Sequence, residues 1–341
     1  MGYDVTIGIP VFKSVDYIRR SLESALAQTY SSIEFLIVDD AGCDGSVEIV
    51  KSIKENHTKG KDIRIIEHKE NLGVSASRNK IIDEAQGEYL YFMDSDDIIS
   101  ENTIELLMQN VHHYDAEIVF GSYERVEISG QKTLYQYPSL QLLHKDELAT
   151  FAYRKYAGIQ ASACNYVVKT SVLRENDHRF IEANYWEDLV FTFDLVTIVS
   201  RAVLLPDITY SYICREYSLS HYQKREVITK DEVMSNVSAI NHLKQSSRRL
   251  CNKIYFPNRC INIVLMDFYI ASSILKRRRI INPYVSNYEI KQMMNHPATF
   301  MQIVSFKQSR LKNLIIYLVG ILPSVLCVAA IFCLGKMKKV I

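Results

Sequence analysis

The chain has 341 residues, which is long enough for one large domain or for two domains. Its 40 Lys and Arg residues balance 39 Asp and Glu residues, so the formal net charge is +1 and gives no reason to expect nucleic acid as a partner. The seven cysteines are scattered without a CxxC pair, so neither a zinc site nor a disulfide framework is predicted, and reduced thiols in the cytoplasm are expected. No signal peptide is expected either.

The first 125 residues alternate short apolar runs with segments of helical periodicity. Strands are predicted at 5–9, 33–38, 63–66 and 88–93, and helices at 17–27, 46–56 and 74–85, the second helix capped by Ser46. Repeated strand–helix units predict an α/β fold with a doubly wound, mostly parallel sheet flanked by helices. Ligands of such sheets bind outside the carboxyl ends of the strands, so the residues that follow each strand are the first candidates for a site.

The pattern loosens in the second third of the chain. Short strands at 117–123, 202–205 and 209–213 and a helix at 187–200 indicate a mixed continuation of the same domain. Helical and polar spacing then dominates residues 228–294. We therefore expect three parts: a domain over residues 1–225, a helical extension over 226–312 and a hydrophobic C-terminal segment over 313–341.

Residues 314–335 form a run of 22 residues without a charge. At about 1.5 Å per residue, a helix of this length would measure roughly 33 Å, enough to cross the hydrocarbon core of a membrane. Gly320 and Pro323 would bend it, and basic residues flank it on both sides. We expect a membrane-associated segment, whose geometry stays open between an interfacial hairpin, a single span and a buried helix.

The apolar run at 87–93 ends in the carboxylate-rich sequence Asp94-Ser95-Asp96-Asp97. On a backbone that is still extended, Asp94 and Asp96 would point to one side and Ser95 to the other. Two carboxylates that face one point can hold a divalent metal ion, and a metal ion there can neutralise a diphosphate. The alternative is an N-cap for the helical pattern that begins near residue 104. One Asp would satisfy that cap, so three favour a metal or nucleotide site.

Three other strand ends carry candidate ligand-binding residues. Residues 8–12 lack the GxGxxG pattern of dinucleotide-binding folds, which counts against a hydride-transfer enzyme. Asp40 follows the second strand and can accept a hydrogen bond from the N–H of a uracil-like base, or simply belong to a turn. Arg78 lies one helical turn after Gly73 and can bind a base or a phosphate, or be an ordinary surface residue.

These strand ends, taken in order, resemble those of a known family. The nucleotide-binding half of family 2 inverting glycosyltransferases with the GT-A fold is similar to three stretches: TIGIPVFKSVDYIRRSLESALAQTYSSIEFLIVDDAGCDGS, NLGVSASRN and GEYLYFMDSDD. The resemblance covers residues 3–125 densely and continues in patches to about residue 222. It implies a nucleotide-diphosphate-sugar donor, most often a UDP-sugar, with Mn²⁺ or Mg²⁺ as cofactor. Residues 1–125 would bind the donor, and 126–225 would form the acceptor side.

The resemblance also implies roles for single residues. It assigns the base of the nucleotide to Pro10, Val11, Asp40 and Arg78, and the ribose and diphosphate to Asp94, Ser95 and Asp96. Asp96, with Asp94 beside it, would hold the metal ion. Asp97 is expected to be a capping or supporting residue.

The sequence WEDLVF at 186–191 resembles the ED motif of the same family. An inverting transfer is a single displacement, so a base must take the proton of the acceptor hydroxyl on the face opposite the leaving diphosphate. The resemblance implies that Asp188 is this base and that its neighbour Glu187 orients the acceptor or the donor sugar. The alternative is a pair of acidic residues favoured by the dipole at a helix N-terminus.

The segment YSYICREYSLS at 210–220 also resembles a family motif, although Tyr217 stands where family members often have Gly. Arg215 or His221 is a candidate for contacting the diphosphate, and an ordinary surface residue is the alternative.

Together these features predict an inverting glycosyltransferase at the cytoplasmic face of a membrane. It would transfer a sugar from a nucleotide-diphosphate donor to a hydroxyl of a saccharide or lipid-linked acceptor, in surface polysaccharide or glycolipid assembly. Two alternatives stay open: a polyprenyl-phosphate sugar synthase, and a non-catalytic protein that binds nucleotide sugars.

Overall fold

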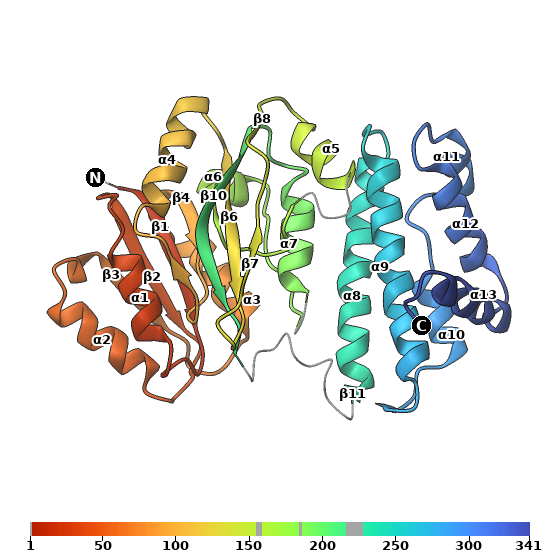
Figure 1. Ribbon diagram of the computed structural model, residues 1–341, viewed down its shortest axis with the longest axis horizontal. Helices are drawn as coiled ribbons and strands as arrows, with labels where there is room; N and C mark the ends of the chain where they lie inside the picture. The colour runs from red at the N-terminus through yellow and green to blue at the C-terminus, as the bar shows by residue number, and fades with distance from the viewer. Residues whose placement is uncertain (1, 155–158, 184–185, 216–227) are drawn as a thin grey trace. The chain divides into compact units, whose positions relative to one another are not determined.

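The structure is a computed structural model of the 341-residue chain, and it describes all residues except 1, 155–158, 184–185 and 216–227 (Figure 1). The chain forms two compact units that interleave along the sequence. The first unit comprises Met1–Leu148, Ser162–Glu182 and Leu195–Ser218. The second comprises Ala149–Ala161, Ala183–Asp194 and Leu219–Ile341.

A ten-stranded sheet forms the centre of the first unit. Eight strands follow the order β3-β2-β1-β4-β9-β6-β10-β5, while β7 pairs with β6 and β8 with β10. The strand bounds are β1 Tyr3–Val11, β2 Ile33–Asp39, β3 Ile63–Glu67, β4 Gly87–Phe92, β5 Ile98–Ile99, β6 Ile118–Val126, β7 Lys132–Tyr135, β8 Leu140–Leu142, β9 Tyr166–Lys169 and β10 Ala202–Ile213.

The first half of this sheet is parallel and the second half is mixed, because β6 and β10 pair in parallel while β5, β7, β8 and β9 pair with their neighbours in antiparallel. Strands β1 to β4 pair in parallel, whereas β9 is antiparallel to both of its neighbours, β4 and β6. The expectation of a mostly parallel sheet is therefore wrong for the second half, where the mixed continuation is found. The two short strands predicted at 202–205 and 209–213 are one strand, β10, whose register shifts between Leu204 and Tyr210.

The helices of the first unit are α1 Ile18–Leu26, α2 Ser46–Asn56, η1 Gly60–Asp62, α3 Val74–Glu84, α4 Thr103–Tyr114 and α6 Thr170–Glu175. Helices α1, α2 and α3 begin and end within one residue of the predicted positions, and α4 begins one residue before the predicted start near residue 104. The predicted cap of α2 is wrong, because Gly45 occupies the N-cap position and Asp44 accepts a hydrogen bond from the Ser46 backbone N–H at 3.1 Å. Helix α3 packs so closely on β1 that a Cβ at Gly8 would lie 2.3 Å from Cγ2 of Ile81.

The second unit is mainly helical (Figure 1). Helix α5 (Glu147–Arg154) begins in the first unit and continues into the second. The other bounds are α7 Glu187–Leu195, β11 Ile228–Thr229, α8 Lys230–Ser247, η3 Arg248–Leu250, α9 Phe256–Arg277, β12 Ile281–Asn282, α10 Asn287–Met293, α11 Phe300–Ser305, α12 Arg310–Ile321 and α13 Ser324–Met337. Capping boxes begin α8, α10 and α11, each pairing a Ser or Thr with a Glu or Gln three residues later.

The hydrophobic run at 314–335 is divided between α12 and α13, with Leu322 and Pro323 between them. Both helices pack against α9, and α13 also packs against α10. The alternative of a single span is therefore wrong. Among the residues that the structure describes, no helix combines the length and the apolar character that a membrane crossing needs.

Candidate active site

The carboxyl ends of three parallel strands meet at one edge of the first unit's sheet. Val11 at the end of β1 is in register with Asp39 at the end of β2, and Gly8 of β1 pairs with Phe92 at the end of β4. The loops that follow these strands therefore emerge side by side, as expected for a ligand-binding edge. Pro10 and Val11 are buried in β1, whereas Phe12, which the sequence analysis did not single out, is 43% exposed just beyond them.

Asp40 holds the loop that follows β3. Its carboxylate accepts hydrogen bonds from the backbone N–H groups of Leu72 and Gly73 at 2.9 and 2.8 Å, and it lies 2.8 Å from Nδ1 of His68. Gly73 has a positive φ of 89° and precedes α3, so Asp40 fixes the start of the helix that carries Arg78. Sequence reasoning assigned Asp40 to the nucleotide base and missed this role in positioning the loop.

Ser95 joins two of the edge loops. Its hydroxyl lies 2.7 Å from that of Ser14, and the backbone N–H of Ser14 donates to the hydroxyl of Ser46 at 2.9 Å. Asp44 accepts a further hydrogen bond from the backbone N–H of Val15 at 3.0 Å. Burial raises the pKa of Asp44, but its bonds to Ser46 and Val15 outweigh burial and lower it. Ser95 thus joins the loop after β4 to the loop after β1, which Ser14 and Val15 in turn join to the residues after β2.

The carboxylate sequence after β4 forms a turn, in which the backbone N–H of Asp97 donates to the carbonyl oxygen of Asp94 at 3.3 Å. The expected extended backbone is therefore wrong. The alternative of a helix cap is also wrong, because β5 follows the turn and Asn102 occupies the N-cap position of α4.

Asp94 is paired with a buried arginine. Nη2 of Arg78 donates to Oδ1 of Asp94 at 2.9 Å, and the Arg78 guanidinium lies 5.3 Å from the ring centre of Phe180. Arg78 is 3% exposed, so the alternative of an ordinary surface residue is wrong. Its position on α3 lets it orient Asp94, a role that sequence reasoning did not assign.

Asp96 is in contact with Arg215, since Nε of Arg215 lies 2.6 Å from Oδ2 of Asp96. The Arg215 guanidinium also lies 4.9 Å from the ring centre of Tyr17. Burial and the neighbouring charge of Asp94 raise the pKa of Asp96, and Arg215 partly opposes them. The interpretation of Arg215 as an ordinary surface residue is therefore wrong. His221, the other candidate in that motif, lies outside the described residues.

Asp97 supports the fold beneath this cluster. Its carboxylate accepts hydrogen bonds from the hydroxyl of Tyr210 at 2.7 Å and from the backbone N–H of Ile213 at 2.8 Å, both on β10. Burial, with the nearby charges of Asp94 and Asp96, raises its pKa well above the usual range. The Tyr210 hydroxyl also accepts from the backbone N–H of Asp94 at 3.3 Å, a link that was not foreseen from the sequence.

Glu187 and Asp188 lie in the first turn of α7, in the second unit. The other end of this helix is anchored by Asp194, which pairs with Nη2 of Arg259. Arg259 is fully buried, and its guanidinium also donates to the Ser246 hydroxyl at 2.9 Å and to the hydroxyl of Tyr153. A buried guanidinium needs such a complete set of acceptors, so this network fixes the helix that presents both carboxylates.

The sequence matches the model described as glycosyl transferase family 2 over residues 6–175, about half of the chain. The chain belongs to this family. Glycosyltransferase GlyG of Streptococcus pneumoniae is 29% identical to this glycosyltransferase over 222 residues, which cover 63% of this chain and 72% of that protein. Cholesterol galactosyltransferase of Borreliella burgdorferi is 22% identical over 290 residues, which cover 81% of this chain and 80% of that protein.

Two solved structures show the same fold. S. aureus TarS 1–349 in complex with UDP-GlcNAc aligns with this glycosyltransferase at a TM-score of 0.58 and 17% identity, over 93% of this chain and 90% of that one. Mannosyltransferase PcManGT from Pyrobaculum calidifontis, in complex with GDP-Man and Mn²⁺, aligns at a TM-score of 0.54 and 14% identity, over 98% and 88% of the two chains. The likeness identifies the α/β architecture of the glycosyltransferase as the GT-A fold.

The carboxylates at the strand ends of the glycosyltransferase fit a divalent cation. Asp94 and Asp96 offer hard oxygen ligands, and burial together with the neighbouring charge of Asp94 raises the pKa of Asp96, which a bound cation would oppose. No cluster of three or more His, Cys, Asp or Glu side chains suited to a metal occurs within the described ranges. A cation held here would therefore complete its coordination with substrate phosphates and water, as Mg²⁺ commonly does.

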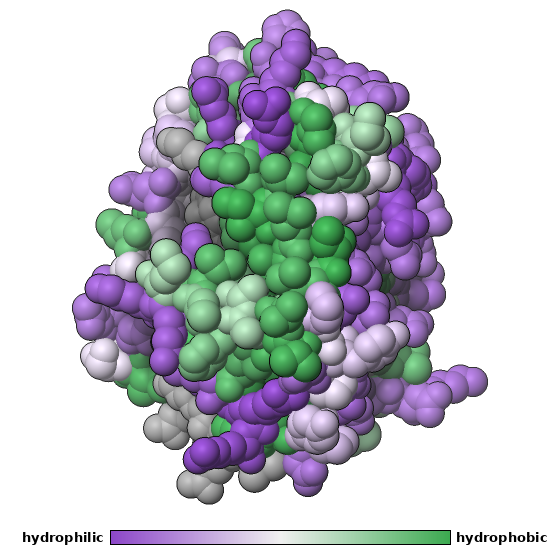
Figure 2. All heavy atoms as spheres, turned by 90° about the vertical axis from the view of Figure 1, so that its right-hand side faces the viewer, coloured by the Kyte–Doolittle hydropathy of each residue, from purple (hydrophilic) through white to green (hydrophobic). Residues whose placement is uncertain are grey.

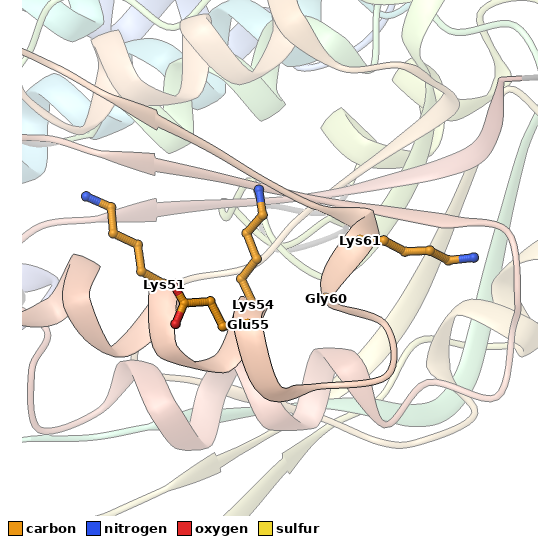
Figure 3. Close-up of a pocket in the computed structure, with 5 residues that line it drawn as sticks. All are labelled: Lys51, Lys54, Glu55, Gly60 and Lys61. Atoms are coloured by element: carbon orange, nitrogen blue, oxygen red, sulfur yellow. The ribbon is translucent and has the colours of Figure 1, made fainter.

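Two pockets lie elsewhere in the glycosyltransferase. One of about 310 Å³ borders α2 and η1 in the first unit; Figure 3 shows that its lysines, Lys51, Lys54 and Lys61, point in different directions, so they form no convergent site. The other has a volume of about 260 Å³ and belongs to the second unit. Trp186, which directly precedes Glu187 in the sequence, is one of the residues that line it. The lining of this pocket is mainly apolar or aromatic and contains one cation: Trp186, Ile228, Val233, Asn236, Tyr269, Ile270, Ser273, Ile274, Arg277 and Ile281.

Proposed function

We propose that this glycosyltransferase transfers a sugar, with inversion, from a UDP-sugar to a hydroxyl group of a saccharide or lipid-linked acceptor in surface polysaccharide or glycolipid assembly. The observation that carries the proposal is the carboxylate turn at the strand ends, where Asp94 and Asp96 are each oriented by an arginine. Negative charge that the surrounding residues leave uncompensated is suited to a cation–diphosphate pair.

The donor side is formed by residues of the first unit. Pro10 and Val11 end β1 beside the base, while Asp40 and Ser95 act by holding the neighbouring loops in place. Arg78 orients Asp94 toward the ribose. Support for a UDP-sugar comes from TarS, whose structure contains UDP-GlcNAc.

Mn²⁺ or Mg²⁺ would be held by Asp96 together with Asp94. When bound, such a cation stabilises the negative charge that develops on the leaving diphosphate. The Mn²⁺ in the complex of PcManGT supports this assignment. Arg215, in contact with Asp96, adds a positive charge near the same leaving group.

The acceptor is activated by Asp188, with Glu187 orienting the acceptor or the donor sugar. The carboxylate of Asp188 takes the proton of the acceptor hydroxyl while its oxygen attacks the anomeric carbon, and the bond from that carbon to the diphosphate breaks. UDP leaves, and the new glycosidic bond has the opposite anomeric configuration. The anchoring of α7 through Asp194 and Arg259 supports the role of a helix that must present a base in a fixed position.

We also propose that the acceptor is lipid-linked and that the enzyme acts at the cytoplasmic surface of the membrane. The pocket lined by Trp186 offers aromatic faces for a sugar ring and Arg277 for a phosphate. The relative from Borreliella burgdorferi is named for a lipid acceptor, cholesterol.

Thermal-shift measurements test the donor side. We expect a UDP-sugar to raise the melting temperature by several degrees in the presence of Mn²⁺, because ligands stabilise the state that they bind. The shift should disappear with EDTA and in Asp96→Ala, and persist in Asp207→Ala, which removes an exposed carboxylate away from the edge. Indifference to every nucleotide sugar would overturn the proposal.

Asp188→Asn separates the proposed reaction from its alternatives. Loss of turnover by a factor of about 10³ with retained UDP-sugar binding supports a hydroxyl acceptor, because a hydroxyl needs a base. Near-normal turnover would instead favour a polyprenyl-phosphate sugar synthase, whose phosphate acceptor is already ionised. A wild-type protein that binds the donor but neither hydrolyses nor transfers it would be a non-catalytic nucleotide-sugar-binding protein.

A further inference from the structure

The second unit presents an apolar surface formed by α11, α12 and α13. Figure 2 shows this face as one continuous hydrophobic area with hydrophilic residues around it. Its most prominent large side chains are between 46% and 75% exposed: Met301, Leu311, Leu318, Ile321, Val325 and Leu326. Single exposed apolar residues are common on proteins, but a continuous area of this kind marks an interaction surface. We call it the α11–α13 face.

The helices of this face have two distinct sides. On α12, the exposed residues Leu311, Leu318 and Ile321 recur at helical spacing, while Ile316 and Val319 between them are buried. The buried side is closely packed, because a Cβ at Gly320 would lie 2.5 Å from the carbonyl oxygen of Met294. The exposed apolar side chains are therefore held by a folded support.

The charged residues in the segment that forms the face have one sign. Beyond Glu289 the sequence contains no Asp or Glu, but it contains seven basic residues: Lys291, Lys307, Arg310, Lys312, Lys336, Lys338 and Lys339. All of them except Lys291 are exposed and lie next to the ends of α12 and α13. An apolar surface rimmed by lysines and arginines complements a layer of anionic headgroups over acyl chains.

The lengths of the helices favour a position on the membrane surface. Helix α12 has 12 residues and α13 has 14, which correspond to about 18 and 21 Å, well below the roughly 30 Å of a hydrocarbon core. Polar ties also fix α12 to its own unit: Asn313 is buried, accepts from Nε2 of His296 at 2.9 Å and donates to the carbonyl oxygen of Pro257 at 3.0 Å.

We propose that the α11–α13 face docks onto a bilayer that contains anionic phospholipids. The exposed apolar side chains enter the region between headgroups and acyl chains, and the basic rim contacts lipid phosphates. The folded second unit stays on the surface of the membrane. The α11–α13 face would account for the membrane location in the proposed function. Docking through this face does not depend on the donor, the metal or the base.

Vesicle co-sedimentation of the full chain tests the proposal. The protein should bind vesicles of phosphatidylcholine with about one third phosphatidylglycerol, and bind pure phosphatidylcholine at least about tenfold more weakly. Ile321→Glu/Leu326→Glu should reduce binding about tenfold or more, because two charged groups would enter the acyl region. Lys338→Glu/Lys339→Glu should have a similar effect, confined to the anionic vesicles.

The chain offers a matched control in the first unit. Ile128 and Leu134 are 59% and 55% exposed, compared with 58% for Ile321 and 55% for Leu326. Ile128→Glu/Leu134→Glu should bind vesicles like the wild type, and melting curves should show that all variants are folded. Equal binding by the Ile321→Glu/Leu326→Glu variant, or no vesicle binding by the wild type, would overturn the proposal. Wild-type dimers that this variant abolishes, without vesicle binding, would identify a second copy of the chain as the occupant.

Because none of these readouts uses a nucleotide sugar, they separate this proposal from the proposed function. Vesicle binding by a protein that ignores every donor would support the docking face and overturn the reaction. Donor binding without vesicle binding would support the reaction and overturn the docking face.

Discussion

The two edges of the first unit's sheet both carry buried carboxylates, but the neighbouring hydrogen-bond donors and cations offset the negative charge to different extents. At the amino edge, Glu34 accepts hydrogen bonds from the Thr6 hydroxyl at 2.6 Å, the Gln86 backbone N–H at 2.8 Å and Nε of Arg64 at 2.9 Å. At the carboxyl edge, Asp94, Asp96 and Asp97 crowd one turn, and the pKa values of the last two are raised.

The difference separates carboxylates that stabilise the fold from those available for a ligand. Lys80 and Arg64 lower the pKa of Glu84, which lies beside Glu34 at the amino edge. At the carboxyl edge, Arg78 and Arg215 do not compensate the burial and mutual repulsion of three carboxylates. A site with excess negative charge lowers the stability of the protein. Such a site is a candidate for cation binding, because destabilising features of this kind occur mainly at functional sites.

The largest effect should come from removing the excess charge. Asp96→Asn keeps the shape of the side chain but loses the charge that would hold the cation. We expect kcat/KM to fall by about 10²- to 10³-fold, measured as UDP release from whichever UDP-sugar stabilises the protein. The melting temperature without donor should not fall. A variant with nearly full activity and a lower melting temperature would mean that Asp96 resembles the amino-edge carboxylates.

The opposite result is expected at the amino edge. Glu34→Gln removes a buried charge that three donors satisfy, and it leaves Arg64 without part of its compensation. We expect the free energy of unfolding to fall by about 2 kcal/mol, as for a lost charged hydrogen bond, measured by urea denaturation. The kcat/KM of the folded enzyme should stay within about twofold of the wild type. A large loss of activity at unchanged stability would contradict the distinction between the edges.

The stability of the two edges should also respond differently to pH. Because the pKa of Asp96 is raised in the folded protein, the folded state binds this proton more tightly than the unfolded state. Tighter proton binding by Asp96 therefore contributes fully to the free energy of unfolding below about pH 4, the pKa of an Asp in the unfolded chain. This contribution is lost as the pH rises through the pKa of Asp96 in the folded protein.

Asp96→Asn should therefore be more stable than the wild type at neutral pH, and the gain should disappear near pH 4. Urea denaturation across this range measures it. Glu34→Gln, in contrast, should be less stable than the wild type at neutral pH. A stability gain of Asp96→Asn that grows as the pH falls would contradict the assignment of the raised pKa.

The sequence predicted the positions of the strand ends well but not their contacts. Alternation of apolar runs and helical segments is a local property, so α3 and β4 were placed within a residue or two of their observed bounds. The pairing of Arg78 with Asp94 could be found only from the fold, because it depends on how α3 crosses the strands. The same holds for Arg215, which reaches Asp96 from the end of β10, some 120 residues away in sequence.

The hydrophobic segment shows a second limit of sequence reasoning. Composition could not distinguish apolar residues that pack inside a unit from those that face outward. Pro323 signalled the break between α12 and α13, yet the division of sides, with Ile316 buried and Leu318 exposed, depends on α9 and α10. The candidate base Asp188 is a different case. Its motif was recognised by resemblance, while its anchoring through Arg259 is a tertiary feature.

Replacing Arg215 should have a smaller effect, which tests one contact of the carboxyl edge. Arg215 opposes the rise in the pKa of Asp96, so Arg215→Gln should raise that pKa further. Asp96 must be ionised to hold a cation, so the acidic limb of the pH profile of kcat/KM should move to higher pH. On the plateau of the profile above the acidic limb, the loss should be only about tenfold, from the missing positive charge.

Arg19→Gln provides the control, because Arg19 is an exposed arginine on α1 whose Nη1 lies 3.7 Å from Oε1 of Glu23 and not beside a carboxylate of the turn. Its pH profile should match the wild type. An acidic limb that moves to lower pH in Arg215→Gln would mean that Arg215 does not act on Asp96. The excess charge of the carboxyl edge would then have to be attributed to Asp94 and Asp97 alone.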